Sequence, residues 1–188
     1  MKKFAFIFAI IVVVVVSVLV KFVFAPSGRF EQTKKSVTIK HMMTISSPAF
    51  GNQKKLPAIY TCDGTNVNPP LQFGGIPEDA ESLVLILDDP DAPGGTWTHW
   101  LVYNIAPTVR EVHEDSIPDD GVEGLTSFRT AGYGGACPPN GTHRYFFKVY
   151  ALDTMLSLES PDHVDSKTVE EAMQGHILDQ AELIGLYR

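Results

Sequence analysis

The chain has 188 residues, of which 44% are hydrophobic, and its formal net charge is −7. The body carries no extended run of Lys and Arg, which argues against nucleic-acid binding because that affinity comes mostly from neutralising phosphates. Two cysteines, Cys62 and Cys137, are too few for a disulfide scaffold. Without its apolar N-terminal segment the chain keeps about 150 residues, the size of one domain.

The N-terminal segment is apolar over nearly the length of a membrane span. After Met1 and two lysines, Phe4–Val20 contains 17 uncharged residues, close to the roughly 20 that cross a bilayer. We expect residues 1–25 to be an uncleaved signal anchor, because this run is longer than the apolar core of a secretory signal. A cleaved signal is the alternative, although Val23–Ala25 is a weak cleavage site and Pro26 disfavours cleavage.

The rest of the chain divides into a linker and a single domain. Residues 26–36 are polar and typical of a flexible linker, and residues 37–188 form the predicted domain. Lysines and arginines lie on both sides of the apolar run, so the positive-inside count leaves the orientation open. Either an anchor or a cleaved signal would place the domain outside the cytoplasm, tethered in the first case and secreted in the second.

The domain shows strand patterns separated by turns. Alternating apolar residues predict a first strand over Val37–Ile45. Ser82–Asp88 is a short apolar run typical of a buried strand, and Trp100–Ile105 is another. Aromatic and β-branched residues at strand spacing predict a strand over His143–Leu152. Several strands between Gly-, Pro- and Asp-rich turns favour an antiparallel sandwich.

One helix is expected near the C-terminus. Thr168 and Glu171 have the spacing of a capping box, and Gly175 can end the helix. The last segment, His176–Arg188, is ambiguous, because its apolar residues fit one face of a helix about as well as a strand.

Two segments carry groups suited to chemistry. In the first, Asp89 ends a strand, because two prolines follow within the sequence DPDAP and cannot remain in a central ladder. His99 opens the next strand, so the intervening hairpin can bring it back toward Asp89. Asp91 lies in the rigid loop between them and is expected to hold that loop through backbone hydrogen bonds.

The second segment is a glycine- and proline-rich loop that runs into a strand, GYGGACPPNGTHRY. Its glycines allow a tight loop whose backbone N–H groups suit an anion, and its prolines stiffen it. His143 and Tyr145 are two residues apart and therefore point to the same side of the predicted strand. Together with Asp89 and His99, they make a candidate pocket for a small anion.

These motifs resemble those of the phosphatidylethanolamine-binding protein family. DPDAP, the Trp-x-His-Trp stretch and GGACPPNGTHRY are similar to its two signature regions. YTCDGTNVNPPLQF and GHILDQAELIGLYR resemble its Raf-kinase-inhibitor-like branch in bacteria and archaea. The resemblance extends from about Met43 to Arg188. It implies a mostly β fold, a Greek-key sandwich with a few peripheral helices, and a strand after the C-terminal helix.

The resemblance also implies a set of site residues and a class of ligand. The ligand-binding residues would be Asp89, His99, Gly135, Pro139, His143 and Tyr145, with Cys137 and Pro138 also in the wall of the pocket. Members bind phosphate-like anions and phospholipid head groups, and some inhibit proteases or kinases. We therefore expect a non-enzymatic binding protein with no cofactor, a phosphoester ligand, a membrane contact through its N-terminal segment, and a protease or kinase as a further partner.

Rival interpretations remain at this point. Two histidines and one carboxylate can hold zinc or iron. His99 with Asp89 can serve a small hydrolase as a general base, although no Ser or Cys nucleophile has a recognised spacing. Cys62 and Cys137 are either buried thiols or a disulfide. Trp97 and Trp100 are expected to be packing residues.

Overall fold

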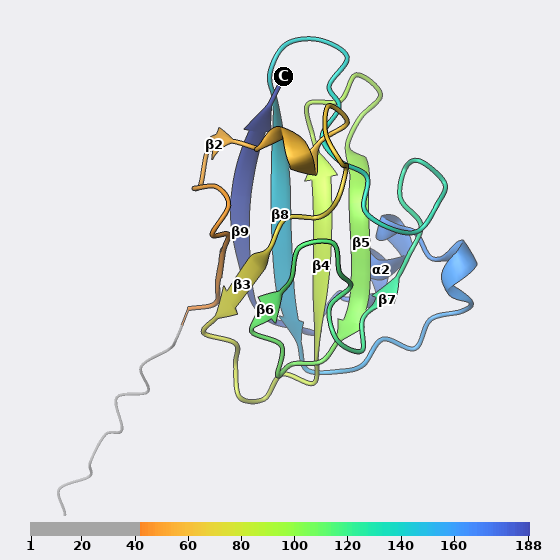
Figure 1. The fold of residues 1–188 in the computed structure, drawn as a ribbon. Helices are drawn as coiled ribbons and strands as arrows, with labels where there is room; N and C mark the ends of the chain where they lie inside the picture. The colour runs from red at the N-terminus through yellow and green to blue at the C-terminus, as the bar shows by residue number, and fades with distance from the viewer. Residues whose placement is uncertain (1–41) are drawn as a thin grey trace, which may run out of the picture. The chain divides into compact units, whose positions relative to one another are not determined.

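A computed structural model describes residues 42–188 and shows two packed β-sheets with short helical segments (Figure 1). The smaller sheet has the order β1-β3-β6, formed by Thr44–Ser46, Leu71–Gly74 and Glu111–Val112. The larger sheet has the order β2-β9-β8-β4-β5-β7, formed by Lys54–Lys55, Ile177–Tyr187, His143–Leu152, Ser82–Asp89, Trp97–Ile105 and Val122–Glu123. The helical segments are η1 (Ala58–Tyr60), η2 (Pro161–His163) and α2 (Ser166–Ala172).

The larger sheet contains a Greek key. β4, β5 and β7 are consecutive antiparallel neighbours, and β8 returns across the sheet to lie beside β4. β9 then adds to β8 as an antiparallel neighbour, and only the two-residue β2 runs parallel to its partner. The expected Greek-key sandwich with a few peripheral helices is therefore confirmed. This topology brings the end of β4 beside the start of β8, where the candidate residues lie.

The larger sheet packs on both faces. One face meets the smaller sheet in a cluster that includes Leu85, Val102 and Phe147. The other face is covered in part by α2, in a second cluster that includes Ile86 and Val169. In Figure 1 strands β3 and β6 of the smaller sheet lie in front of β9 and β8, and α2 lies behind β5. β4 is buried along its whole length because it is central in the sheet and covered on both sides.

Strand positions follow the sequence patterns closely. β8 has the predicted bounds, His143–Leu152, and β4 extends the predicted run by one residue. β5 begins at Trp97 and so includes His99 within the strand. The predicted first strand is shorter than expected within the described chain, where β1 covers Thr44–Ser46. The part of that prediction before Met42 lies outside the described residues.

The N-cap of the C-terminal helix lies three residues before the predicted one. The Asp165 carboxylate accepts a hydrogen bond from the Thr168 amide at 2.9 Å and is the N-cap, so Thr168 lies inside the first turn. Gly175 follows the helix with φ +83, a conformation that glycine adopts without strain. The ambiguous last segment is strand β9, as the family resemblance implied.

Among residues 42–188, no helix is long and apolar enough to cross a membrane. The predicted anchor at residues 1–25, the linker at 26–36 and the first residues of the domain lie outside the described part of the chain.

Candidate functional site

A buried carboxylate–imidazole pair forms the centre of the candidate site. Asp89 ends β4 and His143 begins β8, and these strands are antiparallel neighbours. His143 Nδ1 lies 2.7 Å from Asp89 Oδ2, and both side chains are less than a tenth exposed. The other carboxylate oxygen of Asp89 accepts the Asp91 amide at 2.8 Å. The pair is therefore fixed at the loop end of the sheet.

A β-bulge turns His99 toward this pair. Thr98 pairs with Asp88 and Trp100 pairs with Leu87, so His99 is an extra residue between consecutive pairs. The Thr98 hydroxyl reaches Ser166 of α2 on one face of the sheet. The Trp100 side chain packs in the core on the opposite face. Neighbouring side chains of a regular strand point to opposite faces of the sheet. The bulge instead lets the His99 side chain point to the same face as that of Trp100.

His99 is held by a carbonyl oxygen and by two aromatic rings. Its Nδ1 lies 2.7 Å from the Gly134 carbonyl oxygen, which can only accept, so Nδ1 carries the hydrogen. Its ring meets Tyr145 edge to face at 5.2 Å between centroids, and Phe128 in the same way at 5.4 Å. The structure thus fixes the plane of the imidazole from both sides.

Burial is the largest cause of the pKa shifts of His99 and Tyr145. Burial lowers the pKa of His99, although the Gly134 carbonyl and the Asp89 carboxylate oppose this. Burial raises the pKa of the Tyr145 hydroxyl, and Asp89 raises it further while the Cys137 amide opposes it. His99 is therefore neutral at pH 7, with a lone pair on Nε2, and it must gain a proton before that atom can donate to an anion.

The Tyr145 hydroxyl is the unsatisfied donor of the site. It is buried, and although the Asp89 carboxylate and the Cys137 amide lie close enough to shift its pKa, neither forms a well-aligned hydrogen bond with it within residues 42–188. A buried hydroxyl without a partner costs free energy, which a bound acceptor would recover. The expected cluster of Asp89, His99, His143 and Tyr145 is thus brought together, with one donor left to interact with a ligand.

The glycine loop differs from the expectation of free amides. The Gly134 amide donates to the His99 carbonyl at 2.8 Å, and the Gly135 amide donates to Asn66 Oδ1 at 2.7 Å. These two N–H groups are therefore unavailable to an anion, and Gly135 contributes by close packing instead. A Cβ on Gly135 would lie 2.4 Å from Asn66 Oδ1. Pro139 is exposed, and no described contact joins it to the four central residues.

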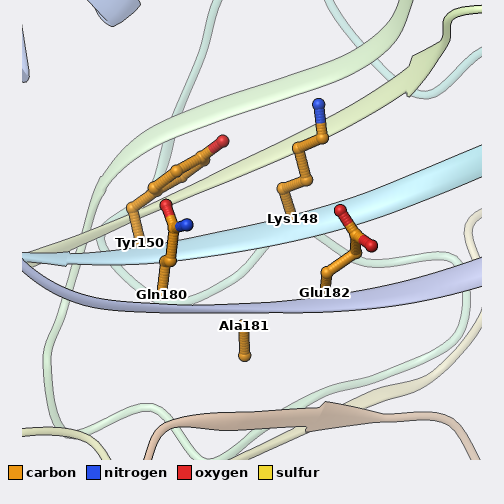
Figure 2. Close-up of a pocket in the computed structure, with 5 residues that line it drawn as sticks. All are labelled: Lys148, Tyr150, Gln180, Ala181 and Glu182. Carbon is orange, nitrogen blue, oxygen red and sulfur yellow. The ribbon is translucent and has the colours of Figure 1, made fainter.

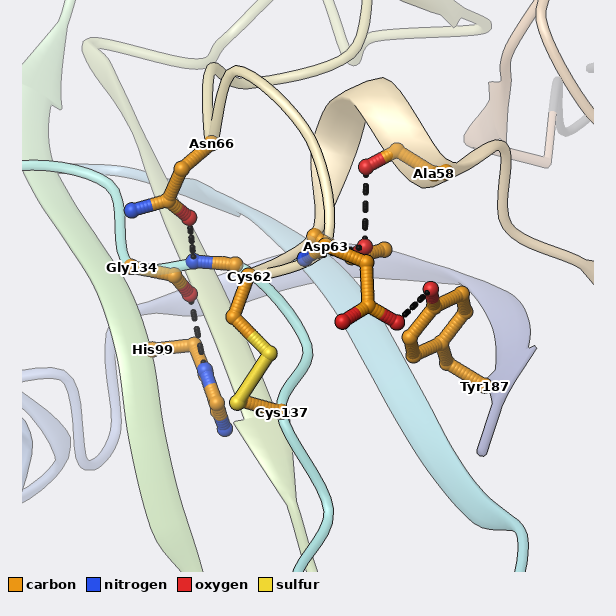
Figure 3. The surroundings of a disulfide bond; sticks show 10 residues. Ala58, Cys62, Asp63, Asn66, His99, Gly134, Cys137 and Tyr187 are labelled. Atoms are coloured by element: carbon orange, nitrogen blue, oxygen red, sulfur yellow. Dashed lines mark hydrogen bonds between the residues drawn. A yellow bond between two sulfur atoms is a disulfide. The ribbon is translucent and has the colours of Figure 1, made fainter.

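The two cysteines form a disulfide, one of the two alternatives left open by the sequence. Cys62 follows η1 and Cys137 lies in the glycine loop, 75 residues apart, with their Cα atoms 5.4 Å from each other. Figure 3 shows the bond beside His99 and Gly134. The segments that it joins also form a parallel bridge between Thr61 and Ala136. The disulfide therefore fixes the glycine loop against the segment that follows η1.

A cleft of about 300 Å³ opens beside the disulfide. Phe128 lines it and also contacts His99, so the cleft and the candidate site share one side chain. None of its lining residues is charged. They are Cys62, Asn66, Thr126, Phe128, Thr130, Gly132, Tyr133, Gly134, Gly135 and Cys137.

Asp91 holds the loop, as predicted, and does so through Arg144. Its carboxylate accepts the Arg144 backbone amide at 3.0 Å and two guanidinium hydrogen bonds at 2.9 and 2.7 Å. These hydrogen bonds lower the pKa of Asp91 to about 2. The pair ties the DPDAP loop to β8 next to His143.

A second cleft of about 470 Å³ lies on β8 and β9 (Figure 2). Lys148, Tyr150, Gln180 and Glu182 project into it, and Ala181 points to the other side of the sheet. Lys148 is tied to Asp88 by an ion pair of 2.8 Å. This cleft contains none of the predicted site residues, which lie on the opposite face of the sheet.

Several features of the site carry no signal in the sequence. Phe128 contacts the site from a loop without a recognisable pattern, whereas Gly134 and Asn66 lie in recognised motifs that do not predict their contacts. Trp97 is 38% exposed and meets Phe128 edge to face at 5.4 Å, so the expectation of a packing residue is wrong for it. Trp100 is buried, as expected, and its indole N–H donates to Glu123.

The structure also bears on the rival chemistries. Asp89 is hydrogen-bonded to His143, and His99 is hydrogen-bonded to the Gly134 carbonyl oxygen, so no hydrogen bond joins Asp89 to His99 among the described residues. Within the described residues, no group of three His, Cys, Asp or Glu side chains is arranged to hold a metal ion.

The fold and the site define a class of protein, a β-sandwich with a buried cluster of polar side chains at the end of its larger sheet. A family model for phosphatidylethanolamine-binding protein matches residues 46–188. A UPF0098 protein of Methanothermobacter thermautotrophicus is 48% identical over 151 residues, covering 78% of this chain and 99% of that protein. A UPF0098 protein of Aquifex aeolicus is 47% identical over 153 residues, and the match covers 78% of this chain and 89% of that protein.

Two solved structures agree. A phosphatidylethanolamine-binding protein homologue of Chlamydia trachomatis superposes with a TM-score of 0.75 at 42% identity, covering 79% of this chain and 98% of that one. Escherichia coli YbcL, described as a new member of the mammalian family, superposes with a TM-score of 0.72 at 31% identity. The match covers 78% of this chain and 98% of YbcL. The chain belongs to the phosphatidylethanolamine-binding protein family, and its function is of the binding type.

Proposed function

We propose that the chain is a non-enzymatic binding protein whose pocket takes a phosphate-like anion or a phospholipid head group. The observation that carries the proposal is the unpartnered Tyr145 hydroxyl, buried beside the Asp89–His143 pair. Phosphate oxygens would accept from Tyr145 and from protonated Nε2 atoms of His99 and His143. Asp89 would balance the imidazolium charge, so that a buried anion meets a compensated site.

Rigidity supports binding rather than catalysis. The Asp91–Arg144 pair, the disulfide and the bonded glycine loop hold the walls in place before a ligand arrives. A preformed pocket needs little ordering to bind a small group. The same pocket would allow the chain to inhibit a protease or kinase if that partner inserted an acidic or phosphorylated side chain into it.

The proposal is tested by titrating the purified chain with phosphate and with O-phosphorylethanolamine while following the histidine ring signals by NMR. His99 and His143 should shift, and His176, which is exposed, should not. His99→Ala should weaken binding by roughly tenfold to a hundredfold, since a hydrogen bond to a charged group contributes about 1.5–3 kcal/mol. No shift at either pocket histidine would refute the site. Phosphoester turnover that is lost in both His99→Ala and Asp89→Ala would refute the non-enzymatic assignment.

Affinity should also depend on pH in a defined direction. Because burial lowers the pKa of His99, the His99 imidazole is neutral at pH 7 when no ligand is bound. The imidazole must therefore take up a proton when an anion binds. Sulfate, whose charge is constant over this range, should bind more tightly as pH falls from 7.5 to 5.5. Calorimetry in buffers of different ionisation enthalpy measures the proton uptake. His99→Gln, which keeps a donor but does not titrate, should flatten the profile, and an unchanged slope would contradict the role of His99.

We further propose that residues 1–25 tether the domain to a membrane, on the basis of the apolar run Phe4–Val20. The full chain should sediment with membranes and resist extraction by high salt, while detergent should release it. Released native protein whose N-terminus is Pro26 or a later residue would instead identify a cleaved signal.

A further inference from the structure

We propose that the Cys62–Cys137 disulfide is a thiol-exchange site through which a small uncharged thiol controls the geometry of the pocket. The binding consequence rests on the function proposed above, whereas the exchange and its effect on His99 do not. Both cysteines are exposed in the described structure, and both line the 300 Å³ cleft. An exposed disulfide is open to attack by a thiolate, which a buried structural disulfide resists.

The cleft beside the disulfide suits a small thiol. Its lining is uncharged and offers the hydroxyls of Thr126 and Thr130, the Asn66 amide and the ring of Phe128. The Thr126 hydroxyl and the Asn66 carbonyl oxygen already take part in hydrogen bonds of the loop, which keeps the lining in shape. A neutral thiol would therefore meet neither repulsion nor a large desolvation cost on its way to the sulfur atoms.

The exchange is balanced in electrons and atoms. A thiolate RS⁻ attacks Cys137 Sγ, the S–S bond breaks, and Cys62 leaves as a thiolate that takes a proton from water. A second thiolate attacks the R-bearing sulfur of the mixed disulfide and releases Cys137 as a thiolate. The two thiols are oxidised to RSSR, and the protein disulfide is reduced to two thiols.

The disulfide is coupled to the pocket through four residues of loop. Gly134 lies three residues before Cys137, and its carbonyl oxygen fixes His99 Nδ1 at 2.7 Å. Reduction leaves four hydrogen bonds on this loop. The Gly134 amide still donates to the His99 carbonyl, the Gly135 amide to Asn66, the Cys62 amide to the Ala136 carbonyl, and the Tyr133 hydroxyl to the Tyr60 carbonyl. With fewer constraints on the Gly134 carbonyl, the orientation of His99 loosens, and the pocket loses preorganisation.

The test compares the oxidised and reduced full chain under native conditions. Millimolar 2-mercaptoethanol should release two titratable thiols, shift the ring signals of His99, and weaken inorganic phosphate binding about tenfold through lost preorganisation. Circular dichroism serves to check that the reduced chain remains folded. Cys62→Ser/Cys137→Ser should reproduce the reduced state without thiol. Asn66→Ala should weaken binding in the same direction, because it loosens the same loop without touching the sulfur atoms.

Two outcomes would overturn the proposal. One is a folded chain whose cysteines remain unreactive in millimolar thiol, which would show that exposure does not give access. The other is a reduced chain in which the His99 signals are unchanged. If neither redox form binds phosphate, the proposed function fails, and the thiol count and His99 signals still decide the exchange and its effect on the pocket.

Discussion

Replacing His143 with Ala should lower the free energy of unfolding by roughly 3–5 kcal/mol, because it leaves the Asp89 carboxylate buried without its partner. The two side chains are only 8% and 4% exposed, so water cannot take over the role of the imidazole. Urea denaturation of the variant and of the parent chain measures the loss, with the slope m checked for two-state behaviour.

The chain contains a matched control for this measurement. His176 forms the same kind of contact with Asp153, at 2.8 Å, but these side chains are 48% and 47% exposed. His176→Ala should therefore cost less than about 1 kcal/mol. Adding Asp89→Asn to His143→Ala should recover part of the lost stability, because it removes the uncompensated charge. Equal losses for His143→Ala and His176→Ala would show that burial of the pair is not what stabilises it.

Removing the disulfide should have an effect of similar size. Cys62→Ser/Cys137→Ser is expected to lower the free energy of unfolding by about 4 kcal/mol, because the bond closes a long loop of 75 residues in the unfolded chain. Reductant should destabilise the parent chain by the same amount and leave the variant unchanged. A variant as stable as the oxidised parent would show that the unfolded chain gains little freedom when the bond is absent.

The two stability predictions concern different parts of the site. His143 and Asp89 join two strands within the sheet, whereas Cys62 and Cys137 join two loops at its end. The double-cysteine variant should therefore keep the His143–Asp89 contact while its glycine loop loosens. Under the thiol-exchange proposal, this separation would allow the redox state to alter binding without unfolding the domain.

The sequence by itself determined the central strands of the larger sheet and the residue types of the candidate site. The run Ser82–Asp88 and the alternation over His143–Leu152 depend only on the local period of apolar side chains, which the pleat of a strand fixes. The motifs around Asp89 and His143 placed both residues at strand ends. The order of the motifs also identified the family that the comparisons then confirmed.

Local signals failed where two of them competed. Thr168 has the spacing of a capping residue, but Asp165, one turn earlier, caps the helix through its carboxylate. The last segment fitted two periods, and pairing of β9 with β8 along nearly its whole length made it a strand. In both cases the energy of the surrounding contacts exceeds the small difference between local preferences.

Only the tertiary structure decided which groups meet. Asp89 was expected near both histidines. The register of β4 on β8 places Asp89 in contact with His143. A bulge in β5 turns the His99 ring toward Tyr145. The disulfide depends on the distance between loops 75 residues apart. Such contacts follow from packing between distant segments, which brings their side chains together whatever their local pattern. The sequence therefore proposed the candidate site residues, and the packing of the two sheets determined which of them contact one another.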